Sequence, residues 1–135
     1  MKKRIIAAVV FVVVALLGFL VFDSVCPKAE KVSVPDKAQV TSVKLGSDSW
    51  AEFQLIPDEY DKLFALMGSI KPTRKQSVND YPYVTPYYTV TISTSEQEYR
   101  CFVYSEDSSV YVEFPYQGIY ESNDQLIDFI LSNRE

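Results

Sequence analysis

The chain opens with one long apolar run, and shorter periodic runs follow it. Residues 5–22 form eighteen consecutive positions without a charged or strongly polar side chain. As a helix rising about 1.5 Å per residue, this run would be roughly 27 Å long, close to the hydrocarbon thickness of a bilayer. Helices of soluble proteins are rarely apolar on every face. The run therefore predicts a membrane-spanning helix.

Beyond residue 37, alternation of apolar and polar side chains predicts β-strands. Gly46 and the three polar residues after it favour a hairpin turn between the first two strands. Short polar connections between the last three strands favour a meander. The alternating runs are 41–45, 51–55, 88–92, 99–104 and 110–114.

Two further segments have apolar residues at helical spacing. The first, 57–70, opens with Pro57 and two acidic residues, as expected at the positive end of a helix dipole. The second follows a capping-box pattern with Ser122 as the cap and Gln125 three residues later. The predicted order is ββαβββα. It favours an α+β two-layer sandwich: a largely antiparallel five-stranded sheet with two helices on one face, in addition to the N-terminal helix.

These patterns divide the chain into three parts. Residues 1–25 are expected to be a cytoplasmic tip and a transmembrane signal-anchor. Residues 26–37 contain two prolines and no sustained period, which is typical of a linker. Residues 38–135 are expected to form an extracytoplasmic α+β domain.

Two alternatives to a retained anchor remain open. A cleaved signal has a shorter apolar region, about 7–15 residues, with small residues three and one positions before the cut. Cleavage after Ser24 would place Phe22 three positions before the cut, and cleavage after Ala29 would place Pro27 there. Lipid attachment at Cys26 needs a Leu-like residue three positions earlier, where Asp23 stands. The sequence favours the retained anchor.

Charge predicts the orientation of the anchor and limits the partners of the domain. Lys2, Lys3 and Arg4 precede the apolar run, which favours a cytoplasmic N-terminus and a domain outside the cell membrane. Beyond the run lie 10 of the 13 basic residues and all 18 acidic residues. A region with this charge of −8 argues against binding nucleic acid or anionic lipid by bulk electrostatics.

The sequence offers few groups for catalysis or metal binding. It has no histidine and only two cysteines, so neither a Ser-His-Asp triad nor a zinc site is expected. Two free thiols, with Cys101 in the core, are favoured over a bridge to Cys26. The four glycines form no phosphate-binding loop, and no cofactor is expected. The remaining enzymatic option is a carboxylate pair, Glu113 and Glu121, acting as in a glycosidase.

Tyrosine is abundant, and several tyrosines fall in irregular segments. Residues 71–86 carry three prolines, and long irregular connections in small domains are often functional. Tyrosine provides a stiff contact area and a hydroxyl group, which suits binding surfaces. Strand tyrosines can equally cover the open face of a sheet, and Asn79-Asp80 can equally form a turn. The candidate binding residues are Asn79, Asp80, Tyr81, Tyr83, Tyr116, Gly118 and Tyr120.

Three segments resemble a family of short, membrane-anchored Firmicute surface proteins that carry a domain of unknown function. They are Ser-Val-Asn-Asp at 77–80 with Pro82, the strand 99–104, and the Pro-Tyr-Gln-Gly-Ile-Tyr run at 115–120. The likeness covers roughly residues 38–133 and implies a location and an architecture, without an activity. A looser likeness, in element order, is to small immunity lipoproteins, from which this chain departs by lacking a good lipidation signal.

The leading functional interpretation is a membrane-tethered, non-enzymatic binding module. Its ligand would be a peptide, a cell-wall component or a membrane partner. An accessory subunit of a membrane complex, contacted through the anchor helix, is one alternative. A carboxylate-dependent wall glycosidase is the other.

Overall fold

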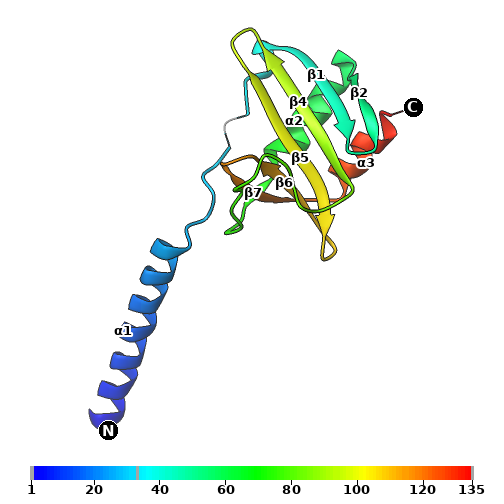
Figure 1. Cartoon of the computed structure of the whole chain (residues 1–135). Helices are drawn as coiled ribbons and strands as arrows, with labels where there is room; N and C mark the ends of the chain where they lie inside the picture. Colours follow the sequence, from blue (N-terminus) through cyan, green and yellow to red (C-terminus); the bar gives the residue numbers. More distant parts are fainter. Residues whose placement is uncertain (1, 33, 135) are drawn as a thin grey trace.

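The computed structural model describes residues 2–32 and 34–134, as an N-terminal helix and an α+β domain (Figure 1). Helix α1 spans Lys2–Val25. An eighteen-residue stretch within its Arg4–Val25 part has a mean hydropathy of 3.3, and none of this stretch is buried. By length and composition, this helix is able to cross a membrane.

The domain is built on one seven-stranded sheet in which every neighbouring pair is antiparallel. The order of strands across the sheet is β2-β1-β4-β5-β6-β7-β3. Short connections join β1 to β2, β4 to β5, β5 to β6 and β6 to β7 as hairpins, and β3 closes the far edge. The strands are β1 (Val40–Ser47), β2 (Trp50–Gln54), β3 (Lys71–Pro72), β4 (Tyr87–Thr94), β5 (Glu98–Glu106), β6 (Ser109–Phe114) and β7 (Gly118–Ser122).

The predicted order ββαβββα with five strands is wrong by two strands, although the α+β class is confirmed. Strand β7 was missed because Pro115 and Gly118 interrupt the alternation. Pro115 lies in a tight turn, in which the Gln117 N–H donates to the Phe114 carbonyl across 3.0 Å. Gly118 follows this turn as the first residue of β7, which returns beside β6. Strand β3 was missed because it has two residues and one is Pro72. An edge strand tolerates proline, since the missing N–H need not face a partner.

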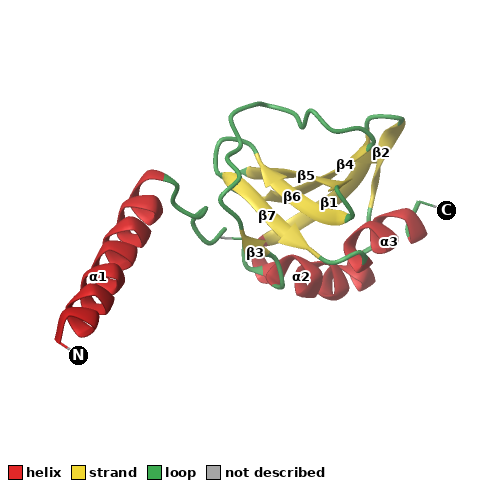
Figure 2. Cartoon of the chain, turned by 90° about the horizontal axis from the view of Figure 1, so that it is seen from below, coloured by secondary structure: helices red, strands yellow, loops and turns green. Residues whose placement is uncertain are grey.

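Two α-helices cover one face of the sheet (Figure 2). A 3-10 turn at Pro57–Glu59 leads into α2 (Tyr60–Gly68), close to the predicted start. Helix α3 spans Gln125–Ser132. The predicted capping box is wrong, because Ser122 is the last residue of β7; instead the Asn123 side chain accepts the Gln125 N–H at 3.1 Å. A second 3-10 turn, Lys37–Gln39, precedes β1.

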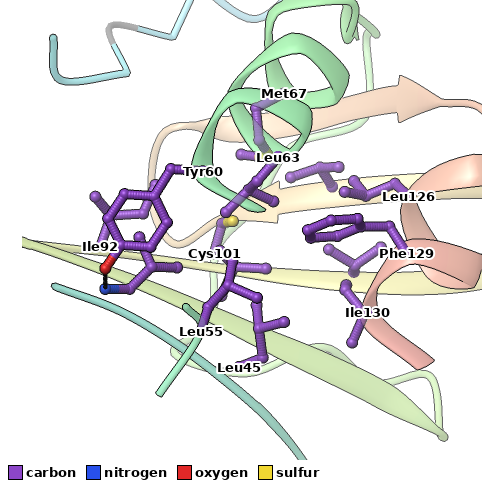
Figure 3. Close-up of a cluster of buried hydrophobic side chains, with 14 of the residues drawn as sticks. Leu45, Leu55, Tyr60, Leu63, Met67, Ile92, Cys101, Leu126, Phe129 and Ile130 are labelled. Carbon is purple, nitrogen blue, oxygen red and sulfur yellow. Dashed lines mark hydrogen bonds between the residues drawn. The ribbon is translucent and has the colours of Figure 1, made fainter. Parts of the chain in front are cut away.

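The core lies between this face and the two helices (Figure 3). Leu63 of α2 and Phe129 of α3 are buried against alternate residues of the central strands. The Val43 N–H donates to the Tyr60 hydroxyl across 3.1 Å, which gives the buried hydroxyl a partner. Cys101 is buried among these side chains, as predicted, and burial raises the pKa of its thiol to about 12.

Part of the segment 26–37 packs on the domain. After α1 the chain runs along one edge of the domain before it reaches β1 (Figure 1). Ala29, Val32 and Val34 are partly buried against the core. The Ala29 N–H donates to the Thr73 carbonyl across 2.9 Å, directly after β3. This stretch therefore extends the β3 edge by one backbone hydrogen bond.

Candidate functional site

The face of the sheet turned away from the helices is covered in part by the loop between β3 and β4. Because Cys101 and Val103 face the helices, Phe102 and Tyr104 face the opposite side. Both are nonetheless buried. The Tyr81 ring lies 5.5 Å from the Phe102 ring. The loop is thus a packed cover over the sheet.

Ser77 and Glu113 hold this loop down. Ser77 is buried, and its hydroxyl donates to the Glu113 carboxylate across 2.6 Å. The same hydroxyl accepts the Tyr116 N–H at 3.3 Å, which ties the loop to the β6–β7 turn. Burial, together with the nearby Glu113 carboxylate, raises the pKa of Tyr104. Buried polar groups with partners of this kind fix one arrangement of the chain around them.

Hydrogen bonds between exposed side chains add to this attachment. The Tyr116 hydroxyl donates to the Asp80 carboxylate at 3.0 Å, and this hydrogen bond raises the pKa of Tyr116. Within the loop, the Tyr83 hydroxyl donates to the Asn79 side chain at 3.0 Å. Tyr116 has a φ of 61°, in the left-handed region that a bulky residue rarely adopts. The structure therefore brings together the two irregular segments, 77–83 and 115–120, that the sequence singled out.

Large hydrophobic side chains are exposed where these two segments meet. The exposed fractions are 63% for Val78, 57% for Tyr81, 87% for Tyr83 and 65% for Tyr116. We call these four residues the tyrosine surface. Among the described residues outside α1, only Ile56 and Leu131 are large hydrophobics of comparable exposure. Exposed apolar groups gathered in one place on a small domain are typical of interaction sites.

Two of the candidate residues lie inside the domain and not on this surface. Tyr120 is only 2% exposed, and its ring meets the Phe114 ring edge-on at 5.7 Å. Its hydroxyl donates to the Glu30 carbonyl. Gly118 is buried, and a Cβ placed there would come within 2.4 Å of the Ala29 Cβ. Tyr120 and Gly118 are therefore not part of the tyrosine surface. Both pack the segment 28–30 against β7.

A cleft of about 280 Å³ opens beside the tyrosine surface. Its walls are Pro27–Glu30, Lys75–Ser77 and Tyr116–Gly118. The first of these walls was missed by the sequence analysis, because residues 26–37 have no regular period. The signal that could have found it is the set of small and apolar residues Ala29, Val32 and Val34 between charged ones.

The two carboxylates considered for glycoside hydrolysis have different surroundings. Glu113 is 5% exposed and lies beneath the loop, where it accepts the Ser77 hydrogen bond. Glu121 is exposed on β7. A glycosidase pair must face the sugar from both sides of the scissile bond. The geometry favours a structural role for Glu113 in holding the loop.

Residues 28–121 match the DUF5301 family, which is described as a domain of unknown function (DUF5300). The chain belongs to this family. The matched region begins within the segment 26–37 and contains the whole tyrosine surface, and every residue lining the cleft except Pro27.

The DUF5301 domain also resembles a solved structure described as the NMR structure of the protein from Ruminococcus gnavus. The two are 27% identical, with a TM-score of 0.63, over 74% of this chain and 99% of that one. No protein with a curated description matches the chain. The likeness extends over nearly the full length of the solved protein.

Proposed function

We propose that this chain is a single-pass membrane protein whose DUF5301 domain lies outside the cytoplasm and acts as a binding module, without catalytic activity. The length and hydropathy of α1 support the anchor. The basic residues at positions 2–4 support a cytoplasmic N-terminus. The motifs at 77–82 and 115–120 support a relationship to short Firmicute surface proteins.

The observation that carries this proposal is the tyrosine surface on a firmly held scaffold. Tyr81, Tyr83 and Tyr116 are all more than half exposed, although they sit on segments tied down by Ser77 and Asp80. A surface that is already ordered loses little conformational entropy when it binds. Tyrosines in such surfaces typically lose about 2 kcal/mol or more of binding free energy on truncation. The ligand is a peptide, a wall component or a membrane partner.

Photocrosslinking from defined positions on intact cells tests this contact. A photoreactive amino acid replaces Tyr83 in one strain and Ile56 in a control strain. Ile56 is 60% exposed and lies beside β2, at the opposite edge of the sheet from β3. We expect adducts from position 83 to lipid, protein or wall material, in clear excess over position 56. Equal labelling from both positions would overturn the proposed contact. A third strain carries the photoreactive residue in α1, and adducts from that strain alone would favour an accessory subunit.

A further inference from the structure

The end of α1 is fastened to the domain through one side chain, Arg74. Its guanidinium donates to the Cys26 carbonyl and pairs with the Asp23 carboxylate at 2.5 Å. It also lies 5.0 Å from the centre of the Phe22 ring. With the Ala29–Thr73 hydrogen bond close by, the chain leaves α1 in a fixed direction. The domain is therefore oriented relative to α1, and does not hang on a free linker.

This attachment places the tyrosine surface near the end of α1. Arg74 is the second residue of the loop that carries three of its four members, and Val78 follows four residues later. At no more than about 3.6 Å per residue, Val78 lies within roughly 14 Å of Arg74 along the chain. If α1 spans a bilayer, Asp23 and Cys26 lie at the boundary of the hydrocarbon, and the next few ångströms are headgroups. Val78 is thus within reach of the lipid–water interface. Tyr83 and Tyr116 are hydrogen-bonded to Asn79 and Asp80, the two residues that follow Val78, which keeps them near it.

The part of the domain near the end of α1 differs in charge from the rest of the domain. The segments 26–32, 73–83 and 115–120 together contain four basic and two acidic side chains. The remaining residues from 33 to 135 contain six basic and fifteen acidic ones. When the two carboxylates that pair with these basic side chains, Asp23 and Glu106, are counted with the first group, its sum is zero, whereas the rest of the domain carries −8. Lipid phosphates therefore repel the rest of the domain and do not repel this end.

We infer that the tyrosine surface rests on the lipid–water interface of the membrane that α1 spans. This inference rests on the proposed function and names the partner of its contact surface. Tyrosine is enriched at membrane interfaces because its ring is apolar and its hydroxyl is polar. Val78 and the exposed ring faces of Tyr83 and Tyr116 provide the apolar contact. Lys28, which is exposed, lines the cleft together with Tyr116 and adds a positive charge there.

Tryptophan fluorescence in vesicles tests the inference on the full-length chain. Trp50 is the only tryptophan, so Trp50→Phe removes the native tryptophan fluorescence. Single tryptophans are then introduced as Tyr83→Trp, Tyr116→Trp or the control Ile56→Trp. The variants are reconstituted in phosphatidylcholine vesicles, with or without bromine on the upper acyl chains. We expect brominated lipid to cause a loss of fluorescence at 83 and 116, and none at 56. Matching melting curves establish that the variants are folded.

The outcomes separate this inference from the proposed function. If positions 83 and 116 are no more quenched than 56, the tyrosine surface does not rest on lipid, and the inference is overturned. In that case, protein or wall adducts from position 83 on intact cells would leave the proposed function standing with a different partner. If those adducts were also missing, both proposals would be overturned.

Discussion

The Tyr116 hydroxyl donates a hydrogen bond to the Asp80 carboxylate across 3.0 Å, and thereby joins two segments that are 36 residues apart. Asp80 belongs to the loop over the sheet, and Tyr116 to the tight turn between β6 and β7. The Tyr116 backbone has a φ of 61°, which costs free energy for any residue with a side chain. The contact with Asp80 helps to keep the exposed tyrosine in this arrangement. It therefore links the local geometry of the turn to the proposed contact surface.

This hydrogen bond predicts a specific pH dependence. The carboxylate of Asp80 raises the pKa of Tyr116 above its ordinary value of 10.0. The contact therefore stabilises the folded state fully below pH 10, and this contribution is lost as the pH rises through the raised pKa. Asp80→Asn should lower the pKa of Tyr116, because the negative charge is removed at nearly constant shape. An NMR titration of the ring carbon next to the hydroxyl measures the change. The same titration curve in both proteins would show that the contact does not form in solution.

The close approach of Gly118 to Ala29 gives a second prediction. Gly118→Ala would place two methyl groups 2.4 Å apart, so the segment 28–30 must move away from β7. We expect a loss of about 1–3 kcal/mol in the free energy of unfolding, as is typical of overpacked sites. Adding Ala29→Gly should recover part of the loss, since it removes the opposing methyl. Denaturant unfolding of the single and double variants measures both effects. A double variant no more stable than Gly118→Ala would argue against this packing.

The sequence predicted strands β1, β2, β4, β5 and β6 and both domain helices, because their apolar residues recur with a clear period. It failed where the period was short or interrupted. Strand β7 follows Pro115 and begins at Gly118, and both residue types interrupt regular structure in a sequence pattern. Its Tyr120 is a binding candidate by sequence, but the side chain is buried in the fold. No periodic pattern in the sequence indicates that Ala29 packs on β7. Ala29 and Gly118 are far apart in the sequence, and only the tertiary fold brings them together. Segments 77–83 and 115–120 flank the same antiparallel strands, and hydrogen bonds from Tyr116 to Ser77 and Asp80 join them.

Residues 26–35 are expected to contribute to the stability of the domain. A protein beginning at Cys26 keeps Ala29, Val32 and Val34 on the core, whereas one beginning at Asp36 loses them together with the hydrogen bond from Tyr120 to Glu30. Both should unfold cooperatively, with the shorter protein less stable by about 2 kcal/mol, from the apolar area exposed. Thermal and denaturant melts of the two proteins make the comparison. Equal stabilities would mean that this stretch does not pack on the domain in solution.

If α1 holds the domain on the outer side of a membrane, protease added to intact protoplasts must reach the domain. Protoplasts that carry the full-length chain with an epitope tag at its C-terminus are treated with protease, before and after lysis. The positive charge at residues 2–4 predicts that protease removes the domain, and the tag with it, while the protoplasts are intact. A cytoplasmic marker protein should survive until lysis and so confirms that the membrane is sealed. If the tag instead persists on intact protoplasts and disappears only after lysis, the domain is cytoplasmic and the proposed orientation of α1 is wrong.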